Sequence, residues 1–130
     1  MPSAGARFPR SVRLLKHADF DHVYQSGKRH FSGHMTVFYL RRSSGGPRVG
    51  FTVGRVLGGA VDRNRIKRRL REAVRRHLAG LAAPVDVVIN PKKSVLTADF
   101  AELDREVARA FEKISRPPSV AGRQPGNAAE

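Results

Sequence analysis

A long amphipathic segment lies between two short runs rich in β-branched residues, and this order limits the folds open to the chain. The segment AVDRNRIKRRLREAVRRHLAGL follows Gly58 and Gly59 and predicts a helix. The flanking runs RVGFTV and VDVVIN have the length and composition of strands. We therefore expect helices packed on a small sheet, an α+β sandwich. The apolar positions that recur at helical spacing in the long segment are Ile66, Leu70, Ala73, His77 and Leu81.

Two further helices are expected, one on each side of this unit. In HADFDHVYQSG, the residues Phe20, Val23 and Tyr24 share one helical face, and Gly27 can end the helix at its C′ position. A second amphipathic helix is predicted from Thr97 onward, with acidic residues near its positive end. Its apolar positions are Phe100, Leu103, Val107, Phe111 and Ile114.

The runs HMTVFYLR and RVGFTV predict two strands, which the Gly- and Pro-containing link SSGGP favours pairing as a hairpin. A short extra strand around Arg29 to Phe31 has weaker support. Asp62 is the expected N-cap of the long helix, and Gly80 lies near that helix's C-terminal end. The predicted order is helix, two or three strands, helix, strand, helix.

The 130 residues suffice for one domain with tails. We expect a flexible basic N-terminus over 1–10, a single domain over 11–115 and a disordered tail over 116–130. With no cysteine, the chain can form no disulfide, thiolate nucleophile or Cys-ligated zinc site. No apolar run approaches the roughly 18 residues of a membrane span, so a cytoplasmic location is expected.

The positive charge is concentrated on the long helix. The chain holds 25 Lys and Arg against 11 Asp and Glu, a formal charge of +14. Between Arg63 and Arg76 stand eight cations, seven of them Arg, with Glu72 as the single acid. Guanidinium groups form paired hydrogen bonds with phosphate oxygens and stack on bases. A helix face that only contacts solvent would mix positive and negative side chains more evenly. The helix therefore predicts a polyanion partner, with cations on nearly every face except one narrow apolar stripe.

A basic helix of this kind has three other interpretations. An anionic membrane surface would call for Trp or Phe anchors, which this helix lacks. A DNA-binding transcription factor would need more Asn or Gln on the helix and a dimerisation segment. A purely structural RNA binder, such as a small ribosomal protein, would use the same helix without a second binding surface.

The segment AVDRNRIKRRLREAVRRH resembles the RNR signature of the bacterial ribonuclease P protein family. The resemblance extends to LLKHADFDHVYQSGKR, RVGFTV and PVDVVINPKK, in matching order over roughly Arg13 to Ile114. It implies an αβββαβα sandwich with a left-handed βαβ crossover, the fold of the second domain of a small-subunit ribosomal protein. Such a crossover runs against the usual right-handed rule.

Family membership implies a function as well. The protein would pair with the ribonuclease P RNA, which removes the 5′ leader from precursor tRNA with Mg²⁺ held through the RNA. The resemblance implies no catalytic residue, metal ligand, bound cofactor, membrane contact or small-molecule substrate in the protein. Scattered histidines, and carboxylates at the spacing of a solvated helix face, agree with that division of labour.

Two sets of binding residues follow from the resemblance. One set would contact the RNA subunit: Arg63, Asn64, Arg65, Lys67, Arg68, Arg71 and Arg75. The other would hold the single-stranded leader: Phe20, Tyr24, Arg55, Lys92 and Lys93. Plainer roles are open for several of them: first-turn capping for Asn64, core packing for the two aromatic rings and simple solvation for the three cations.

The chain departs from the family pattern beside the leader surface. Arg55 is followed by Val56 where two adjacent basic residues are common, and Gly54 and Gly59 replace side chains that are often polar or basic. The leader surface is therefore expected to be less basic than is usual in the family, whereas the signature helix is intact.

Overall fold

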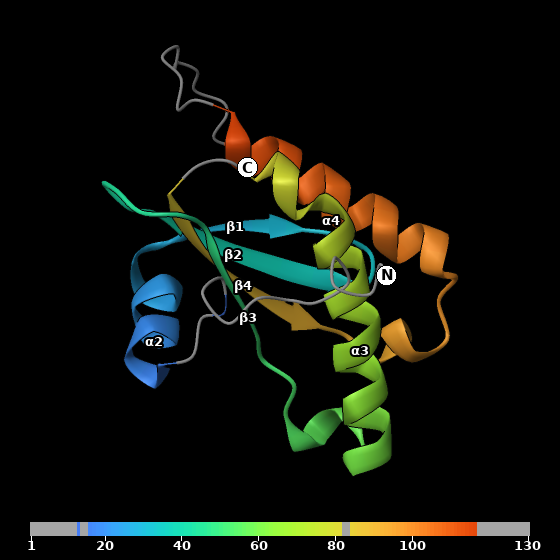
Figure 1. The fold of residues 1–130 in the computed structure, drawn as a ribbon. Coiled ribbons are helices and arrows are strands. Elements are labelled where there is room, and N and C mark those ends of the chain that lie inside the picture. Colours follow the sequence, from blue (N-terminus) through green and yellow to red (C-terminus); the bar gives the residue numbers. More distant parts are fainter. Residues whose placement is uncertain (1–12, 14–15, 82–83, 117–130) are drawn as a thin grey trace.

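The computed structural model describes residue 13 and residues 16–81 and 84–116. The predicted order of helices and strands is confirmed, including the weakly supported first strand (Figure 1). Short 3-10 turns, η2 (Arg55–Leu57), η3 (Leu78–Gly80) and η4 (Lys93–Leu96), join some of them. The main elements are α2 (His17–Ser26), β1 (Lys28–Phe31), β2 (Met35–Arg41), β3 (Arg48–Phe51), α3 (Ala60–His77), β4 (Val85–Pro91) and α4 (Phe100–Ser115).

The four strands form one mixed sheet in the order β1-β2-β4-β3. The predicted hairpin of β2 with β3 is wrong, because β4 lies between them, antiparallel to β2 and parallel to β3. β4 is buried along almost its whole length, so it gains most from a neighbour on each side. The hairpin that does form joins β1 to β2, and the parallel β3-α3-β4 unit expected from the resemblance is present.

The sheet separates two apolar clusters. Helices α3 and α4 cover one face, where Val85, Val87 and Ile89 of β4 enter the main core together with the apolar stripes of both helices (Figure 1). Helix α2 covers part of the opposite face, which we call the α2 face, where Val23 packs on Val88. The alternation along β4 thus supplies both cores, which places a helix on each side of the strand.

Glycines set the ends of α2 and α3. Gly27 is the C-cap of α2 with an extended backbone, not a left-handed C′ residue. A Cβ there would lie 2.5 Å from the carbonyl oxygen of Tyr39 and 2.6 Å from that of Val23, so a close approach requires this glycine. The expected Asp62 cap of α3 is also wrong: Gly59 is the N-cap, and Gly58 makes the preceding turn at φ 126°.

Helix α4 begins after its N-cap Asp99, and all the predicted apolar positions except the partly buried Phe100 are fully buried. The predicted flexible N-terminus and most of the predicted tail lie outside the described residues. Arg116, the first residue of that tail, is described, and its carbonyl oxygen accepts a hydrogen bond of 2.8 Å from Arg41. In the described part of the chain, no helix is long and apolar enough to span a membrane.

Candidate nucleic-acid interface

The solvent-facing side of α3 carries most of the residues predicted to bind RNA. Asn64, Arg65, Arg68 and Arg71 are exposed, while Ile66, Leu70, Ala73 and Val74 anchor the opposite side in the core. Within the described residues, these four exposed side chains and the half-buried Lys67 make no hydrogen bond or ion pair. We call these five residues the α3 basic face: Asn64, Arg65, Lys67, Arg68 and Arg71.

The remaining two predicted contacts on α3 are partly engaged within the protein. The Arg63 Nε donates a hydrogen bond of 3.2 Å to the carbonyl oxygen of Gly58, which ties the helix to the turn before it. Arg75 forms an ion pair with Glu72 one turn earlier. Both side chains are half-buried, so they flank the α3 basic face.

Two further cations of α3 contact neighbouring elements: Arg69 is half-buried, whereas Arg76 is exposed and pairs with α4. Arg69 donates hydrogen bonds to the carbonyl oxygens of Leu96 and Ala98 at the end of η4. The Arg76 Nε lies 2.9 Å from an oxygen of Asp104, and its guanidinium carbon lies 5.9 Å from the ring centroid of Phe100. These two arginines join α3 to the segment that leads into α4 and to α4 itself.

The predicted aromatic residues of the leader surface lie between α2 and the sheet. The Tyr24 hydroxyl donates to Asn90 Oδ1 at 2.7 Å and lies 2.6 Å from Thr52 Oγ1. Its ring meets Phe38 edge to face, with 4.8 Å between the centroids. Phe20 packs in the same cluster, and both predicted rings are only partly buried. Both rings therefore contribute to packing and keep a part open to solvent.

The sequence prediction missed Phe38, Thr52 and Asn90, although strand alternation could have indicated Phe38. Met35, Val37 and Tyr39 of β2 point into the main core, so Phe38 between them must lie on the α2 face. Thr52 and Asn90 were less accessible to such reasoning. They come together only because β3 and β4 are neighbours in the sheet.

The three cations predicted for the leader surface lie in segments that follow two neighbouring strands of the sheet. Arg55, Lys92 and Lys93 are exposed, and they follow the carboxyl ends of the parallel strands β3 and β4. Tyr24 bonds Thr52 and Asn90 at the same end of these two strands. The departures from the family pattern are not forced by packing, because a Cβ at Gly54 or Gly59 would meet no atom within 4 Å.

At the opposite end of α2, the charges are already compensated. The Arg48 guanidinium grips the buried Asp86 through two hydrogen bonds of 2.8 Å, and the Arg42 Nε lies 2.9 Å from the same carboxylate. The hydrogen bond to Asp86 raises the pKa of Arg48, so its positive charge is secure. This cluster holds the starts of β3 and β4 together beside a depression that Asp19 and His22 also line.

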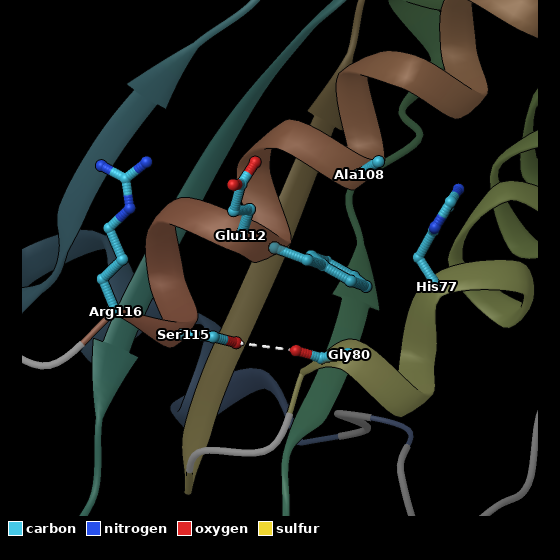
Figure 2. Close-up of a pocket in the computed structure, with 7 residues that line it drawn as sticks. His77, Gly80, Ala108, Glu112, Ser115 and Arg116 are labelled. Carbon is cyan, nitrogen blue, oxygen red and sulfur yellow. Dashed lines mark hydrogen bonds between the residues drawn. The ribbon is translucent and has the colours of Figure 1, made fainter.

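A separate pocket lies on the other side of the sheet, between the C-terminal ends of α3 and α4 (Figure 2). Its volume is about 370 Å³, and its lining includes His77, Phe111 and Glu112. The Ser115 hydroxyl donates a hydrogen bond of 2.9 Å to the carbonyl oxygen of Gly80 and closes one side. The lining is mixed in charge and partly apolar, unlike the α3 basic face.

The fold and these surfaces define a small basic α+β protein with one helix face suited to a polyanion. The family model described as Ribonuclease P matches residues 8–115. The chain belongs to the bacterial ribonuclease P protein family, as the resemblance of its motifs implied. It is thus a protein component of an endoribonuclease ribonucleoprotein of tRNA processing, and an RNA partner follows from membership.

Individual relatives agree with this assignment. The chain is 40% identical over 111 residues to the ribonuclease P protein component of Acidothermus cellulolyticus, covering 83% of this chain and 92% of that protein. It is 35% identical to the component of Finegoldia magna, over 82% of this chain and 93% of the relative. The solved structure of the Thermotoga maritima ribonuclease P protein matches with a TM-score of 0.71 at 26% identity, over 78% of this chain and 96% of the other. The expected fold class is therefore confirmed.

Proposed function

We propose that this chain binds the catalytic RNA of ribonuclease P through α3 and the 5′ leader of precursor tRNA through the α2 face of the sheet. It thereby assists the RNA-catalysed, Mg²⁺-dependent removal of the leader that gives the mature tRNA 5′ end. The observation that carries the proposal is the α3 basic face, whose cations lack partners within the described protein.

The α3 basic face suits the backbone of a folded RNA. Arg65, Arg68 and Arg71 project from one rigid helix, so their spacing is fixed before binding and little order has to be gained. Each guanidinium can fork onto phosphate oxygens. Asn64 adds an amide that can donate and accept, and a capping role for it is excluded because Gly59 caps the helix. In the proposal Arg63 and Arg75 bind RNA at the flanks of this face.

The α2 face suits a single-stranded segment of variable sequence. Phe20 and Tyr24 keep part of each ring open to solvent, and stacking on an aromatic ring tolerates every base. Three exposed cations follow the carboxyl ends of β3 and β4, where they can neutralise leader phosphates: Arg55, Lys92 and Lys93. Binding through base stacking and phosphate contacts does not depend on base sequence, so it suits leaders that differ from one precursor tRNA to the next.

The chemistry belongs to the RNA in this proposal. Mg²⁺ is held by the RNA and supplies the activated water, while the protein's side chains bind and orient the substrate. Among the described residues, no group of three or more His, Asp or Glu side chains lies close enough to hold a metal ion. The complex would act in the cytoplasm, on precursor tRNA.

Reconstitution with a bacterial ribonuclease P RNA tests the proposal. The protein alone should not cleave precursor tRNA, and it should stimulate the RNA at Mg²⁺ concentrations where the RNA alone is nearly inactive. The complex should also bind precursor tRNA more tightly than mature tRNA. Failure to stimulate would overturn the proposal, and equal affinities would favour a purely structural RNA binder.

A pair of phenylalanine variants tests the leader surface within that assay. Phe20→Ala should reduce the preference for precursor over mature tRNA, because it removes an open ring from the α2 face. Phe100→Ala is the matched control, since Phe100 is also partly buried but packs on the opposite side of the sheet. Circular dichroism must show that both variants are folded. Equal loss of preference in both would remove Phe20 from the leader surface.

A further inference from the structure

The aromatic ring of Phe31 is exposed to solvent on β1, an edge strand of the sheet. Its side chain is 69% exposed at the end of β1, and the guanidinium carbon of Arg29 lies 5.6 Å from the ring centroid. Single exposed hydrophobic residues are common and need no explanation by themselves. Its position in the sheet, however, sets Phe31 apart from such residues.

The strand register aligns Phe31 with the residues beneath Tyr24. Phe31 stands opposite Thr36 of β2, and Thr36 stands opposite Asn90 of β4. Thr52 follows the pair of Phe51 with Ile89 and continues the row on the β3 side. Residues directly opposite one another in a sheet point to the same face. A row of side chains therefore crosses the α2 face: Phe31, Thr36, Asn90 and Thr52.

The adjacent row explains why Phe31 is open. Arg29 stands opposite Phe38, and Phe38 stands opposite Val88. Helix α2 packs mainly on β2 and β4, so it covers Phe38 and Val88 and leaves the β1 end of both rows exposed. Phe31 is a diagonal neighbour of Phe38, at a separation of roughly 7–8 Å for such pairs. The α2 face thus continues from the rings under α2 to Phe31.

We propose that Phe31, with Arg29, is a further stacking platform for an unpaired base of the RNA strand held on the α2 face. The inference rests on the function proposed above and extends it from the region beneath α2 to the edge strand. A base would stack on the open side of the Phe31 ring, and the Arg29 guanidinium would meet the adjacent phosphate.

The charge of β1 favours RNA as the occupant. The strand reads Lys28, Arg29, His30 and Phe31 and carries no acid, and both Lys28 and Arg29 are exposed. A short edge strand with exposed cations is poorly suited to pairing with a second copy of the same strand. The same cations attract a phosphate backbone.

The Phe31→Trp variant gives a direct readout, because the chain contains no tryptophan. In the reconstituted ribonuclease P complex, its fluorescence should be quenched by precursor tRNAs whose leaders are long enough to reach β1. Mature tRNA and precursors with the shortest leaders should leave the fluorescence unchanged. Quenching by mature tRNA to the same extent would overturn the assignment.

Affinity measurements with the same leader series provide the second test. Phe31→Ala should weaken binding of long-leader precursors by about fivefold or more, the equivalent of one lost stacking contact, and leave short-leader precursors unaffected. Phe31→Tyr should restore binding. If all three proteins bind every leader alike while precursor remains preferred over mature tRNA, the platform is refuted and the proposed function stands. If the wild-type complex shows no such preference, the function itself fails.

A self-association test examines the alternative that β1 binds a second copy of the protein. If sedimentation shows a dimer of the protein that Phe31→Ala dissolves, and the Trp fluorescence responds to protein concentration and not to leader, then β1 binds a second copy. That result would overturn the inference.

Discussion

The salt dependence of RNA binding offers the sharpest test of the α3 basic face. We consider the double variant Arg68→Ala/Arg71→Ala. Both side chains are exposed, and neither makes a hydrogen bond or ion pair with any described residue. Alanine is also a strong helix former. The double variant should therefore fold with wild-type stability, so that any change in RNA affinity reports a lost contact with RNA.

The expected magnitude follows from counterion release. Each lost phosphate contact lowers the slope of log K against log salt by about 0.7 to 0.9, so two contacts lower it by about 1.4 to 1.8. Between 50 and 200 mM salt, the affinity of the variant should then fall about tenfold less than the affinity of the wild type. The difference between the two proteins should be largest at low salt.

The assay is titration of labelled ribonuclease P RNA at several salt concentrations. Arg105→Ala/Arg109→Ala is the matched control, because it removes the same charge from exposed positions of α4. The control should keep a slope close to that of the wild type. An unchanged slope in the α3 variant would remove these two arginines from the interface. An equal drop in both variants would mean that net charge alone attracts the RNA.

Three further predictions concern the fold and can be measured by urea denaturation. Gly27→Ala should destabilise the protein by about 1–3 kcal/mol, because its Cβ would press on two backbone carbonyl oxygens; an unchanged midpoint would show that the chain can move apart there. Asp86→Ala should destabilise the protein by about 1.5–3 kcal/mol, because two guanidiniums lose their buried carboxylate partner; wild-type stability would show that this cluster is dispensable. Arg69→Ala should cost about 1–2 kcal/mol through its lost hydrogen bonds and keep the salt slope of RNA binding; a flatter slope would place Arg69 in the interface.

The sequence predicted the α3 basic face more completely than it predicted the proposed leader surface. The α3 basic face follows from helical periodicity, because the buried stripe of Ile66 and Leu70 fixes which positions face solvent. Helical spacing could not show that Arg69 bonds to the end of η4 or that Arg76 pairs with α4. Their hydrogen-bond partners lie 27 or more residues further along the chain, so only the packing of α3 against η4 and α4 reveals them.

The proposed leader surface depended more on tertiary structure. Phe20 and Tyr24 share a helical face, which is visible in the sequence, but the residues that complete their surroundings are contributed by separate strands. The incorrect hairpin of β2 with β3 would have removed the pairing of Thr36 with Asn90, because β4 could not then lie beside β2. Without the true strand order, the row that links Phe31 to the residues beneath Tyr24 could not be drawn.

The sequence alone determined which segments are helices and strands, which face of α3 is cationic and to which family the motifs point. These features depend on local periodicity and composition, where neighbouring residues along the chain carry the information. The tertiary structure decided the strand order, the contacts of Arg69 and Arg76 with other elements, and the rows across the α2 face. The strand order and the rows arise because β4 is buried on both faces and inserts between strands that precede it in the chain. The arginine contacts arise because α3 packs against η4 and α4, whose residues lie far away along the chain.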